Sequence, residues 1–268
     1  MMLNFIYWDV SPIIFSWGPI TVRWYGLLFA TSFLVGYYIM AYIFKKEGKD
    51  ENDLNDLIWY MILGTVIGAR LGHVLFYNPS YYLSNPIEIL EIWKGGLASH
   101  GAGIGILIAI YLYSRKKSAQ SFLWTIDRIV ITVALAGFFI RTGNLFNSEI
   151  IGKPSDLPWA FIFASVDDIP RHPTQIYEAL AYLSIFIFLF SFYKKKFGQL
   201  KEGLIFGLFL ITVFGFRFCV EFLKENQSQF EQYLPLNMGQ LLSIPFIAAG
   251  IYFVLRKETK KLKIDLHK

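Results

Sequence analysis

Apolar runs of about 20 residues recur along this chain, and an α-helix of that length crosses the ~30 Å hydrocarbon core of a bilayer. Hydrophobic residues make up 55% of the 268 residues and charged residues only 17%, below the ~25% usual for soluble domains. Because backbone polar groups in lipid must be paired within the protein, spanning segments are helices or closed barrels. The runs are continuous rather than alternating, which favours helices. We therefore expect an all-α polytopic membrane protein in which residues 1–268 form one domain.

The sequence predicts about seven transmembrane helices, at 20–44, 57–77, 98–113, 122–141, 175–193, 202–222 and 239–255. Four short polar stretches hold 16 of the 25 lysines and arginines, at 45–56, 114–121, 193–203 and 256–268. Each stretch follows an odd-numbered helix, so the positive-inside rule places all four, and the C-terminus, in the cytoplasm. The N-terminus then lies outside. This bias accounts for the net charge of +5, and we expect no nucleic-acid partner.

The chain has one cysteine, Cys219, which lies inside an apolar run. One cysteine forms no disulfide framework or zinc cluster within the chain, and the carboxylates are not spaced as a metal site. We expect no metal and no cofactor, and we expect Cys219 to be buried in its helix. The first 15 residues lack a basic segment and a small-residue cleavage site, so we expect no removable signal peptide.

Several titratable side chains lie within or at the ends of the apolar helices, namely Arg23, Arg70, His73, His100, Arg141, Arg217 and Glu221. A charge at mid-bilayer costs roughly 2.5–3.5 kcal/mol, so such residues usually face a protein interior or a cavity and mark function. Plainer roles stay open for some of them. Arg23 could reach the membrane interface, and Arg70 could form a structural network with His73. Arg217 could pair with Glu221, four residues later on one helical face. Lys94, Lys153, Arg171 and Lys224 are assigned to outer loops or their edges.

The densest polar run is Arg141-Thr-Gly143-Asn144-Leu-Phe-Asn147-Ser-Glu149-Ile-Ile-Gly152. It leaves a predicted helix and enters the longest outer loop, 142–174, and loops of that length are often functional. An ordinary helix end does not need an arginine, two asparagines and a glutamate so close together. This pattern favours a binding or catalytic role for the run.

Two further segments combine polar residues with helix starts. His100 lies between Gly95-Gly96 and Gly101-Ala-Gly103-Ile-Gly105. These glycines either let a ligand approach the backbone or let two membrane helices pack closely. The segment Arg171-His172-Pro173-Thr174-Gln175-Ile-Tyr177-Glu178 ends the long loop, with Thr174 as the expected helix N-cap. Glu178 could simply complement the helix dipole.

These segments together resemble the phosphatidylglycerol–prolipoprotein diacylglyceryl transferase family. The family signature G-R-x-G-N-x-x-N-x-E-x-x-G matches residues 140–152, with Ile140 in place of the first glycine. Further matching segments are Arg23-Trp-Tyr25-Gly26-Leu27, Gly68-Ala-Arg70-Leu-Gly72-His73-Val-Leu-Phe-Tyr77, residues 171–178, Arg217-Phe-Cys-Val-Glu221-Phe and Met238-Gly239-Gln240. The His-Gly-Gly of the family reads His100-Gly101-Ala102, a second departure. Both departures concern local packing more than chemistry, and the resemblance spans residues 12 to 250.

The resemblance implies an activity and its partners. Such an enzyme moves the diacylglyceryl group of phosphatidylglycerol to the lipobox cysteine thiol in the signal peptide of a preprolipoprotein. It forms a thioether and releases glycerol-1-phosphate, the first step of bacterial lipoprotein maturation. The expected partners are therefore phosphatidylglycerol, the precursor and the lipid bilayer, and the expected location is the bacterial cytoplasmic (inner) membrane.

The resemblance also assigns catalytic roles. We expect Arg141 and Arg217 to hold the phosphate, because guanidinium groups bind it bidentately, and to stabilise the charge that grows as the carbon–oxygen bond breaks. His100 is the natural candidate for the base that takes the thiol proton, although it could instead donate a hydrogen bond to the lipid. His172 is a second candidate, or only a loop anchor. Further expected substrate-binding residues are Tyr25, Asn144, Glu149, Gly152, Tyr177 and Glu221.

Two other classes of protein compete with this interpretation. A transporter or channel would use the intramembrane arginines to pass an anion, and it predicts broken helices in corresponding halves. We find no inverted repeat. A non-catalytic lipid-binding or scaffold protein would bind phosphatidylglycerol and release no product.

Overall fold

The computed structural model describes residues 5–18, 20–92, 95–117, 119–225 and 234–257. The chain forms two compact units. The first combines Met1–Ile39 with Asp127–Lys268, and the second is Met40–Ile126.

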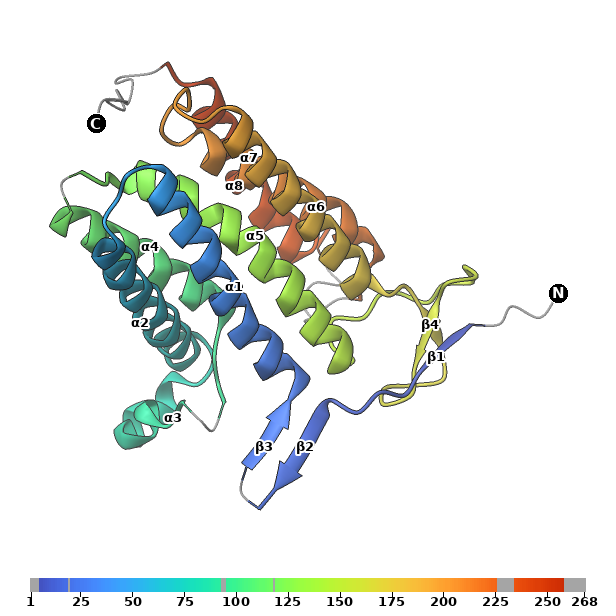
Figure 1. Ribbon diagram of the computed structural model, residues 1–268. Coiled ribbons are helices and arrows are strands. Elements are labelled where there is room, and N and C mark those ends of the chain that lie inside the picture. Colours follow the sequence, from blue (N-terminus) through green and yellow to red (C-terminus); the bar gives the residue numbers. More distant parts are fainter. Residues whose placement is uncertain (1–4, 19, 93–94, 118, 226–233, 258–268) are drawn as a thin grey trace. The chain divides into compact units, whose positions relative to one another are not determined.

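Seven long helices dominate the described residues: α1 (Trp24–Lys46), α2 (Glu51–Phe76), α4 (Ser99–Lys116), α5 (Phe122–Phe146), α6 (Thr174–Lys195), α7 (Leu204–Val220) and α8 (Met238–Leu255) (Figure 1). Each coincides with one predicted helix, and the helical membrane class is confirmed. Six of the described helices are long and apolar enough to span a bilayer. The exception is α4, whose ends carry His100, Arg115 and Lys116. The count of seven spans and the orientation of the termini stay predictions.

Helix ends differ from the predicted ones for local reasons. α2 begins at Glu51, six residues earlier than expected, because the side chain of Asp50 caps it by accepting from the amide of Asn52. α5 continues to Phe146, so the polar run that starts at Arg141 begins on the helix and not beyond its end.

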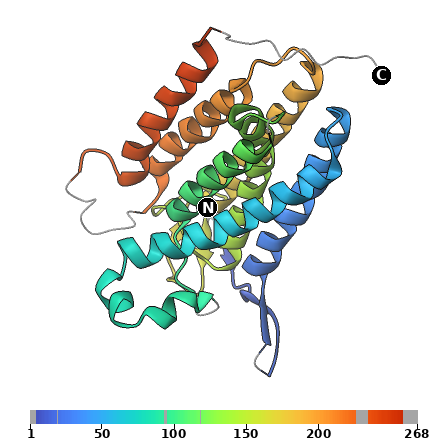
Figure 2. The same ribbon diagram turned by 90° about the vertical axis from the view of Figure 1, so that its left-hand side faces the viewer.

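A β-hairpin precedes α1, where the sequence predicted helix from residue 20. It pairs β2 (Ile13–Trp17) with β3 (Ile20–Arg23) in antiparallel register and extends directly from α1 (Figure 2). The hydroxyls of Ser16 and Thr21 lie 2.9 Å apart across the pair. Arg23 is the exposed last residue of β3, so it lies outside the helix.

Three short strands organise the long loop after α5. β1 (Ile6–Trp8) runs parallel to β4 (Phe161–Phe163), and β4 pairs antiparallel with β5 (Pro170–Arg171). The indole of Trp8 donates to the carbonyl of Leu145 at 3.1 Å. Leu145 and β4 share one apolar cluster, so the loop is packed onto the C-terminal end of α5.

Helices α6, α7 and α8 pack in sequence order within the first unit (Figures 1 and 2). The start of α7 is capped from α5, because the buried carboxylate of Asp127 accepts from the amides of Gly203 at 2.6 Å and Phe206 at 2.7 Å. A short 3₁₀ turn, η3 (Glu221–Leu223), continues α7.

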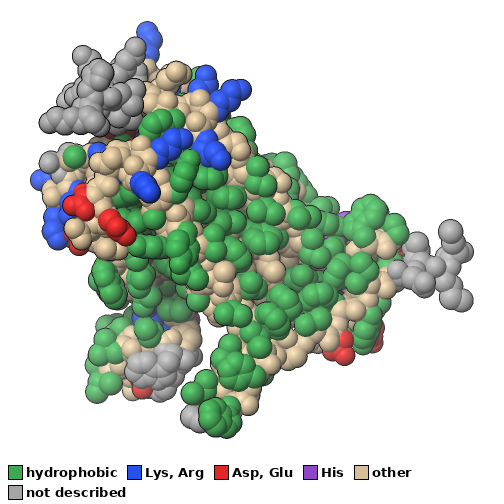
Figure 3. All heavy atoms as spheres, viewed as in Figure 1, with side chains coloured by type: hydrophobic (Ala, Val, Ile, Leu, Met, Phe, Trp, Pro, Cys, Tyr) green, Lys and Arg blue, Asp and Glu red, His purple; other side chains and the backbone are tan. Residues whose placement is uncertain are grey.

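One group of basic residues in each unit lies at helix ends and in the turns between helices. In the first unit, Lys201 donates to the carbonyls of Val254 and Arg256, which joins the α6–α7 loop to the end of α8. In the second, Lys49 donates to Ala119 and Lys117 pairs with Asp53. Figure 3 shows lysines and arginines at helix ends and hydrophobic side chains over the visible faces of the helices. The basic residues predicted at 258–268 lie outside the described residues.

Glycines join α2 to α4 in the second unit. A Cβ placed on Gly68 would lie 2.8 Å from Gly105 Cα, and one on Gly72 would lie 2.7 Å from Gly101 Cα. Two of the glycines after His100 therefore serve close helix packing, whereas Gly103 faces open space. An apolar groove of about 790 Å³ runs along this seam.

Arg70 has a structural role in the same unit. It is 4% exposed, and its guanidinium donates to the carbonyls of Glu88, Ile89, Gly95 and Gly96. It thereby holds two segments against α2: the 3₁₀ turn η1 (Pro86–Leu90), which follows α3 (Pro79–Ser84), and the pair Gly95-Gly96.

Candidate active site

A cluster of charged side chains lies where the end of α5, the first turns of α6 and the end of α7 come together. Its members, called here the charged cluster, are Arg141, Glu178, Arg217, Glu221 and Lys224. Glu178 is fully buried, Lys224 is 2% exposed and Glu221 is 6% exposed. Charges this deeply buried are retained only when they are paired.

Glu178 joins α6 to the rest of the cluster. Its Oε2 lies 3.2 Å from Arg141 Nε and 2.9 Å from Lys224 Nζ. Both contacts are ion pairs by distance, but neither cation is oriented to donate a hydrogen bond to this oxygen. Its Oε1 accepts from the Tyr182 hydroxyl at 3.2 Å.

Glu221 completes the link to Arg217. Its Oε1 lies 3.1 Å from Lys224 Nζ and 3.6 Å from Arg217 Nε, so the ion pair that the sequence left open as one role for Arg217 is present. Asn237 donates to its Oε2 at 3.2 Å. A Cβ on Gly239 would lie 2.5 Å from the Glu221 carboxyl carbon, so the glycine of Met238-Gly239-Gln240 makes room for this carboxylate.

The charged cluster has a surplus of positive charge. Three cations face two carboxylates, and the contacts run from Arg141 through Glu178, Lys224 and Glu221 to Arg217. The Arg217 side chain is 37% exposed, against 13% for Arg141. The surplus charge is therefore accessible at Arg217, which suits an anionic ligand.

A second group of contacts extends from Arg141 along the polar run. Arg141 Nη1 donates to Asn144 Oδ1 at 3.1 Å, and Asn144 Nδ2 donates to Glu149 Oε2 at 3.1 Å. The other oxygen of Glu149 accepts from Asn147 at 3.1 Å. Asn144 is 4% exposed, whereas Glu149 is exposed. The structure thus brings three predicted site residues into one hydrogen-bonded series.

Tyr25, at the start of α1, joins this group by packing. A Cβ on Gly143 would lie 2.8 Å from the Tyr25 ring, so this glycine admits the ring against α5.

Gly152, His172 and Tyr177 form a neighbouring group. The Gly152 amide donates to the His172 carbonyl at 3.0 Å, and a Cβ on Gly152 would lie 2.5 Å from His172 Cβ. Packing therefore explains a glycine here. The Tyr177 hydroxyl lies 3.4 Å from His172 Nδ1 and accepts from the indole of Trp159 at 2.9 Å. Burial lowers the pKa of the His172 imidazole.

Arg171 fixes the loop that carries this group. It is 9% exposed, and it pairs with Asp167 at 2.6 Å and Glu225 at 2.8 Å. The hydrogen bonds from Arg171 lower the pKa of the Asp167 carboxyl. Gly152 forms an antiparallel bridge with Lys224, so the same loop places Lys224 beside the polar run.

His100 is not among the residues that the first unit brings together. It belongs to the second unit, where it is exposed. Its ring stacks on Tyr77 with centroids 5.9 Å apart, and it meets Phe76 edge-on at 5.4 Å. Its role as base stays a prediction.

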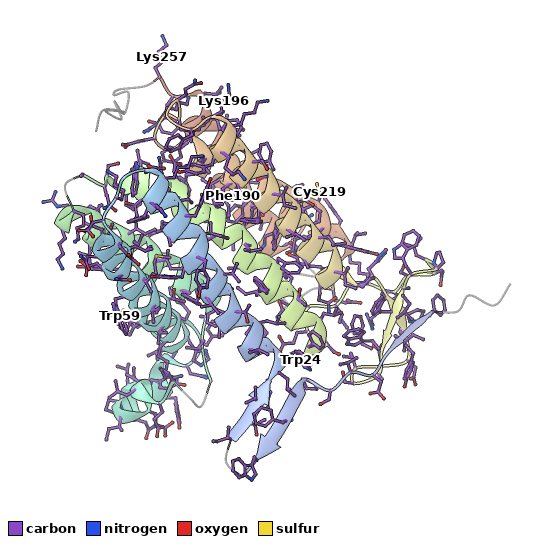
Figure 4. The ribbon with its side chains drawn as sticks, viewed as in Figure 1. Trp24, Trp59, Phe190, Lys196, Cys219 and Lys257 are labelled. Carbon is purple, nitrogen blue, oxygen red and sulfur yellow. The ribbon has the colours of Figure 1, made fainter. Side chains whose placement is uncertain are left out.

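Two expectations about side chains are wrong. Thr174 is not the N-cap of α6 but its first residue, and the cap position belongs to Pro173. Cys219 is exposed on α7 rather than buried, because it lies on the outward face of that helix (Figure 4).

Sequence reasoning missed Lys224 and left Glu178 with a weaker role. Lys224 was assigned to a loop edge, although it follows Glu221 by three residues, the spacing of one helical turn. Glu178 does not merely complement the helix dipole, since it is the buried partner of two cations.

Comparisons with known proteins identify the family of this chain. The model of the family described as prolipoprotein diacylglyceryl transferase matches residues 12–256. Phosphatidylglycerol–prolipoprotein diacylglyceryl transferase of Chloroherpeton thalassium is 53% identical over 94% of this chain and 94% of its own length. The proteins of that name from Tolumonas auensis and Porphyromonas gingivalis are 47% and 44% identical, over 96% and 94% of this chain and 100% and 94% of their own. The chain belongs to the prolipoprotein diacylglyceryl transferase family, as its motifs predicted.

Proposed function

We propose that this chain transfers the diacylglyceryl group of phosphatidylglycerol to the lipobox cysteine thiol of a preprolipoprotein. Its relatives carry the name of this activity. The observation that carries the proposal is the surplus positive charge of the charged cluster, accessible at Arg217. A phosphodiester headgroup carries one negative charge, which this surplus matches.

The reaction places its main electrostatic demand on the phosphate. The thiolate sulfur bonds to the glycerol carbon that carries the phosphate, and the carbon–oxygen bond breaks. The electron pair leaves on the phosphate oxygen, so glycerol-1-phosphate departs with more negative charge than the diester held. Cations that are fixed in place before reaction stabilise this transition state more than the ground state.

Arg141 suits this task because its guanidinium is held in advance. Glu178 pairs with its Nε, and Asn144 accepts from its Nη1. Arg217 is held by one ion pair and is more exposed. We assign Arg217 to capture of the headgroup phosphate and Arg141 to the charge that grows on the departing oxygen.

The headgroup glycerol fits at Glu149, the exposed end of the hydrogen-bonded series Arg141–Asn144–Glu149. Glu149 is exposed, and its carboxylate is held by Asn144 and Asn147. A carboxylate accepts hydrogen bonds from neighbouring hydroxyls, so Glu149 is assigned to the glycerol. Tyr25 packs beside this run at Gly143, and Tyr177 contacts His172. Glu221 and Gly152 act through Arg217 and His172.

Removal of the thiol proton needs modest help. A thiol of pKa ~8.5 is only a few per cent thiolate at pH 7, and full ionisation costs about 2 kcal/mol. We assign this proton to His100, with His172 as the alternative. Residues 1–268 then work as one transferase domain in the bacterial inner membrane, with the basic stretches in the cytoplasm.

The test is incubation of the purified protein with phosphatidylglycerol vesicles and a synthetic lipobox peptide. Mass spectrometry should show one diacylglyceryl group on the cysteine, and a peptide with serine in its place should stay unmodified. A transporter would instead move anions across sealed vesicles without an adduct. A scaffold would bind phosphatidylglycerol and release no glycerol-1-phosphate, and either result would overturn the proposal.

A further inference from the structure

The turn that carries Glu149 has an unfavourable backbone. Ser148 has φ of 52° and Ile150 has φ of 57°. Positive φ is uncommon outside glycine and is a genuine outlier for a β-branched residue such as isoleucine. Such conformations persist only where surrounding contacts impose them.

The first two residues of α6 supply such contacts. Thr174 Oγ1 donates to the carbonyl of Ile150 at 2.8 Å, and Gln175 Nε2 donates to the carbonyl of Glu149 at 2.6 Å. Both side chains are fully buried. Gln175 Oε1 is buried without a hydrogen-bond partner in the described structure, so the amide is oriented by its donor side. The two hydrogen bonds therefore fix the consecutive carbonyls of Glu149 and Ile150 in the strained turn.

The other side of the turn is held by α5. The amide of Glu149 donates to the carbonyl of Asn144 at 3.0 Å, and the amide of Ser148 donates to that of Leu145 at 3.0 Å. The backbone of Glu149 is thus fixed at its amide by α5 and at its carbonyl by α6. The position of this backbone sets whether the Glu149 carboxylate can reach its two donors, Asn144 and Asn147.

We propose that Thr174 and Gln175 are positioning residues that hold the strained turn and so aim the Glu149 carboxylate at Asn144 before lipid binds. The inference rests on the proposed function, in which Glu149 receives the headgroup glycerol. The glycerol hydroxyls lie away from the bond that breaks, so they are bound alike in ground and transition states. Misplacement of the Glu149 carboxylate therefore raises KM for phosphatidylglycerol more than it lowers kcat.

Thr174 offers a matched pair of variants. Thr174→Ser keeps the donor hydroxyl, whereas Thr174→Val keeps the shape and loses the donor. We expect Thr174→Val to raise KM for phosphatidylglycerol about tenfold, and we expect Thr174→Ser to stay within about twofold of the unmodified protein. Gln175→Glu, which replaces the donor by an acceptor, should behave as Thr174→Val does.

A second variant separates positioning from general stability. Asparagine adopts positive φ more readily than isoleucine, so Ile150→Asn should hold the turn with less help from α6. The effect of Thr174→Val on KM should therefore shrink to about threefold or less in the Ile150→Asn background, a coupling that a merely destabilising change would not give.

The outcomes are distinct. If the unmodified protein forms no adduct, the proposed function itself fails. If adduct forms but Thr174→Val matches Thr174→Ser, or its effect is the same with Asn at position 150, the positioning role is overturned. Circular dichroism and thermal unfolding of each purified variant show whether it is folded, and a folded variant with an unchanged KM also counts against the inference.

Discussion

Arg141 differs from a generic positive charge because two partners fix its guanidinium at separate nitrogens. Lysine keeps the charge but lacks the planar fork that binds phosphate bidentately. We expect Arg141→Lys to lower turnover about 100-fold, the scale of losing one transition-state donor, while the protein still inserts and folds. The measurement is the adduct assay, with Arg256→Lys at the end of α8 as a control. Turnover near that of the unmodified protein would contradict the assignment.

Lys224 is the cation shared by Glu178 and Glu221. Replacing it with methionine keeps the length and removes the charge between two buried carboxylates. Breaking a buried ion pair from one side costs about 3–5 kcal/mol, so Lys224→Met should lower both the thermal unfolding temperature and adduct formation. Lys224→Arg preserves the charge and should retain most of both. Equal stability of the two variants would show that Lys224 does not hold the charged cluster together.

His172 gives a prediction for pH. Its imidazole pKa is lowered by burial, so the folded protein binds that proton less readily than the unfolded chain. The stability contributed by neutral His172 is then present above the ordinary pKa of ~6.5 and is lost as pH falls through and below that value. An NMR titration, with the signal assigned by a His172→Gln variant, should give a midpoint below 6.5. A midpoint above that value would show the imidazole to be stabilised as a cation.

At the scale of elements, the seam between α2 and α4 depends on bare glycines. A Cβ on Gly68 would lie 2.8 Å from Gly105 Cα, whereas one on Gly103 meets nothing within 4 Å. Gly68→Ala should therefore lower stability by about 1–3 kcal/mol through overpacking, and Gly103→Ala should leave it unchanged. Unfolding of the purified proteins in detergent measures both. A tolerated Gly68→Ala would mean that the helices separate easily.

Helix positions could be predicted from the sequence because a continuous apolar run is a signal that each segment carries by itself. The approach of Arg217 to Glu221 could be anticipated for a similar reason, since the two residues are only four positions apart. The partner of Arg141 was not, because Glu178 is 37 positions away and meets it only through tertiary packing. The strands β1 and β4 were also missed, because each is three residues long, too short to show the alternation of apolar and polar residues that marks a strand.

At the scale of the whole molecule, the orientation in the membrane follows from the basic stretches alone and calls for a direct test. In a Cys219→Ser background, Asp156→Cys should react with a membrane-impermeant maleimide in cells whose inner membrane is intact. Lys196→Cys should react only after that membrane is opened, because the positive-inside rule places it in the cytoplasm. The reverse pattern would invert the predicted topology.

The first turns of α6 serve several parts of the site at once. Thr174 and Gln175 grip the strained turn, Tyr177 meets His172, and Glu178 pairs with Arg141. Successive residues of an α-helix are rotated by about 100° around its axis. The number of residues between these positions therefore fixes the direction in which each side chain points. A single inserted or deleted residue in this stretch would misdirect the downstream contacts together, whereas a substitution removes only one. Length, more than composition, is therefore what natural variation must preserve here.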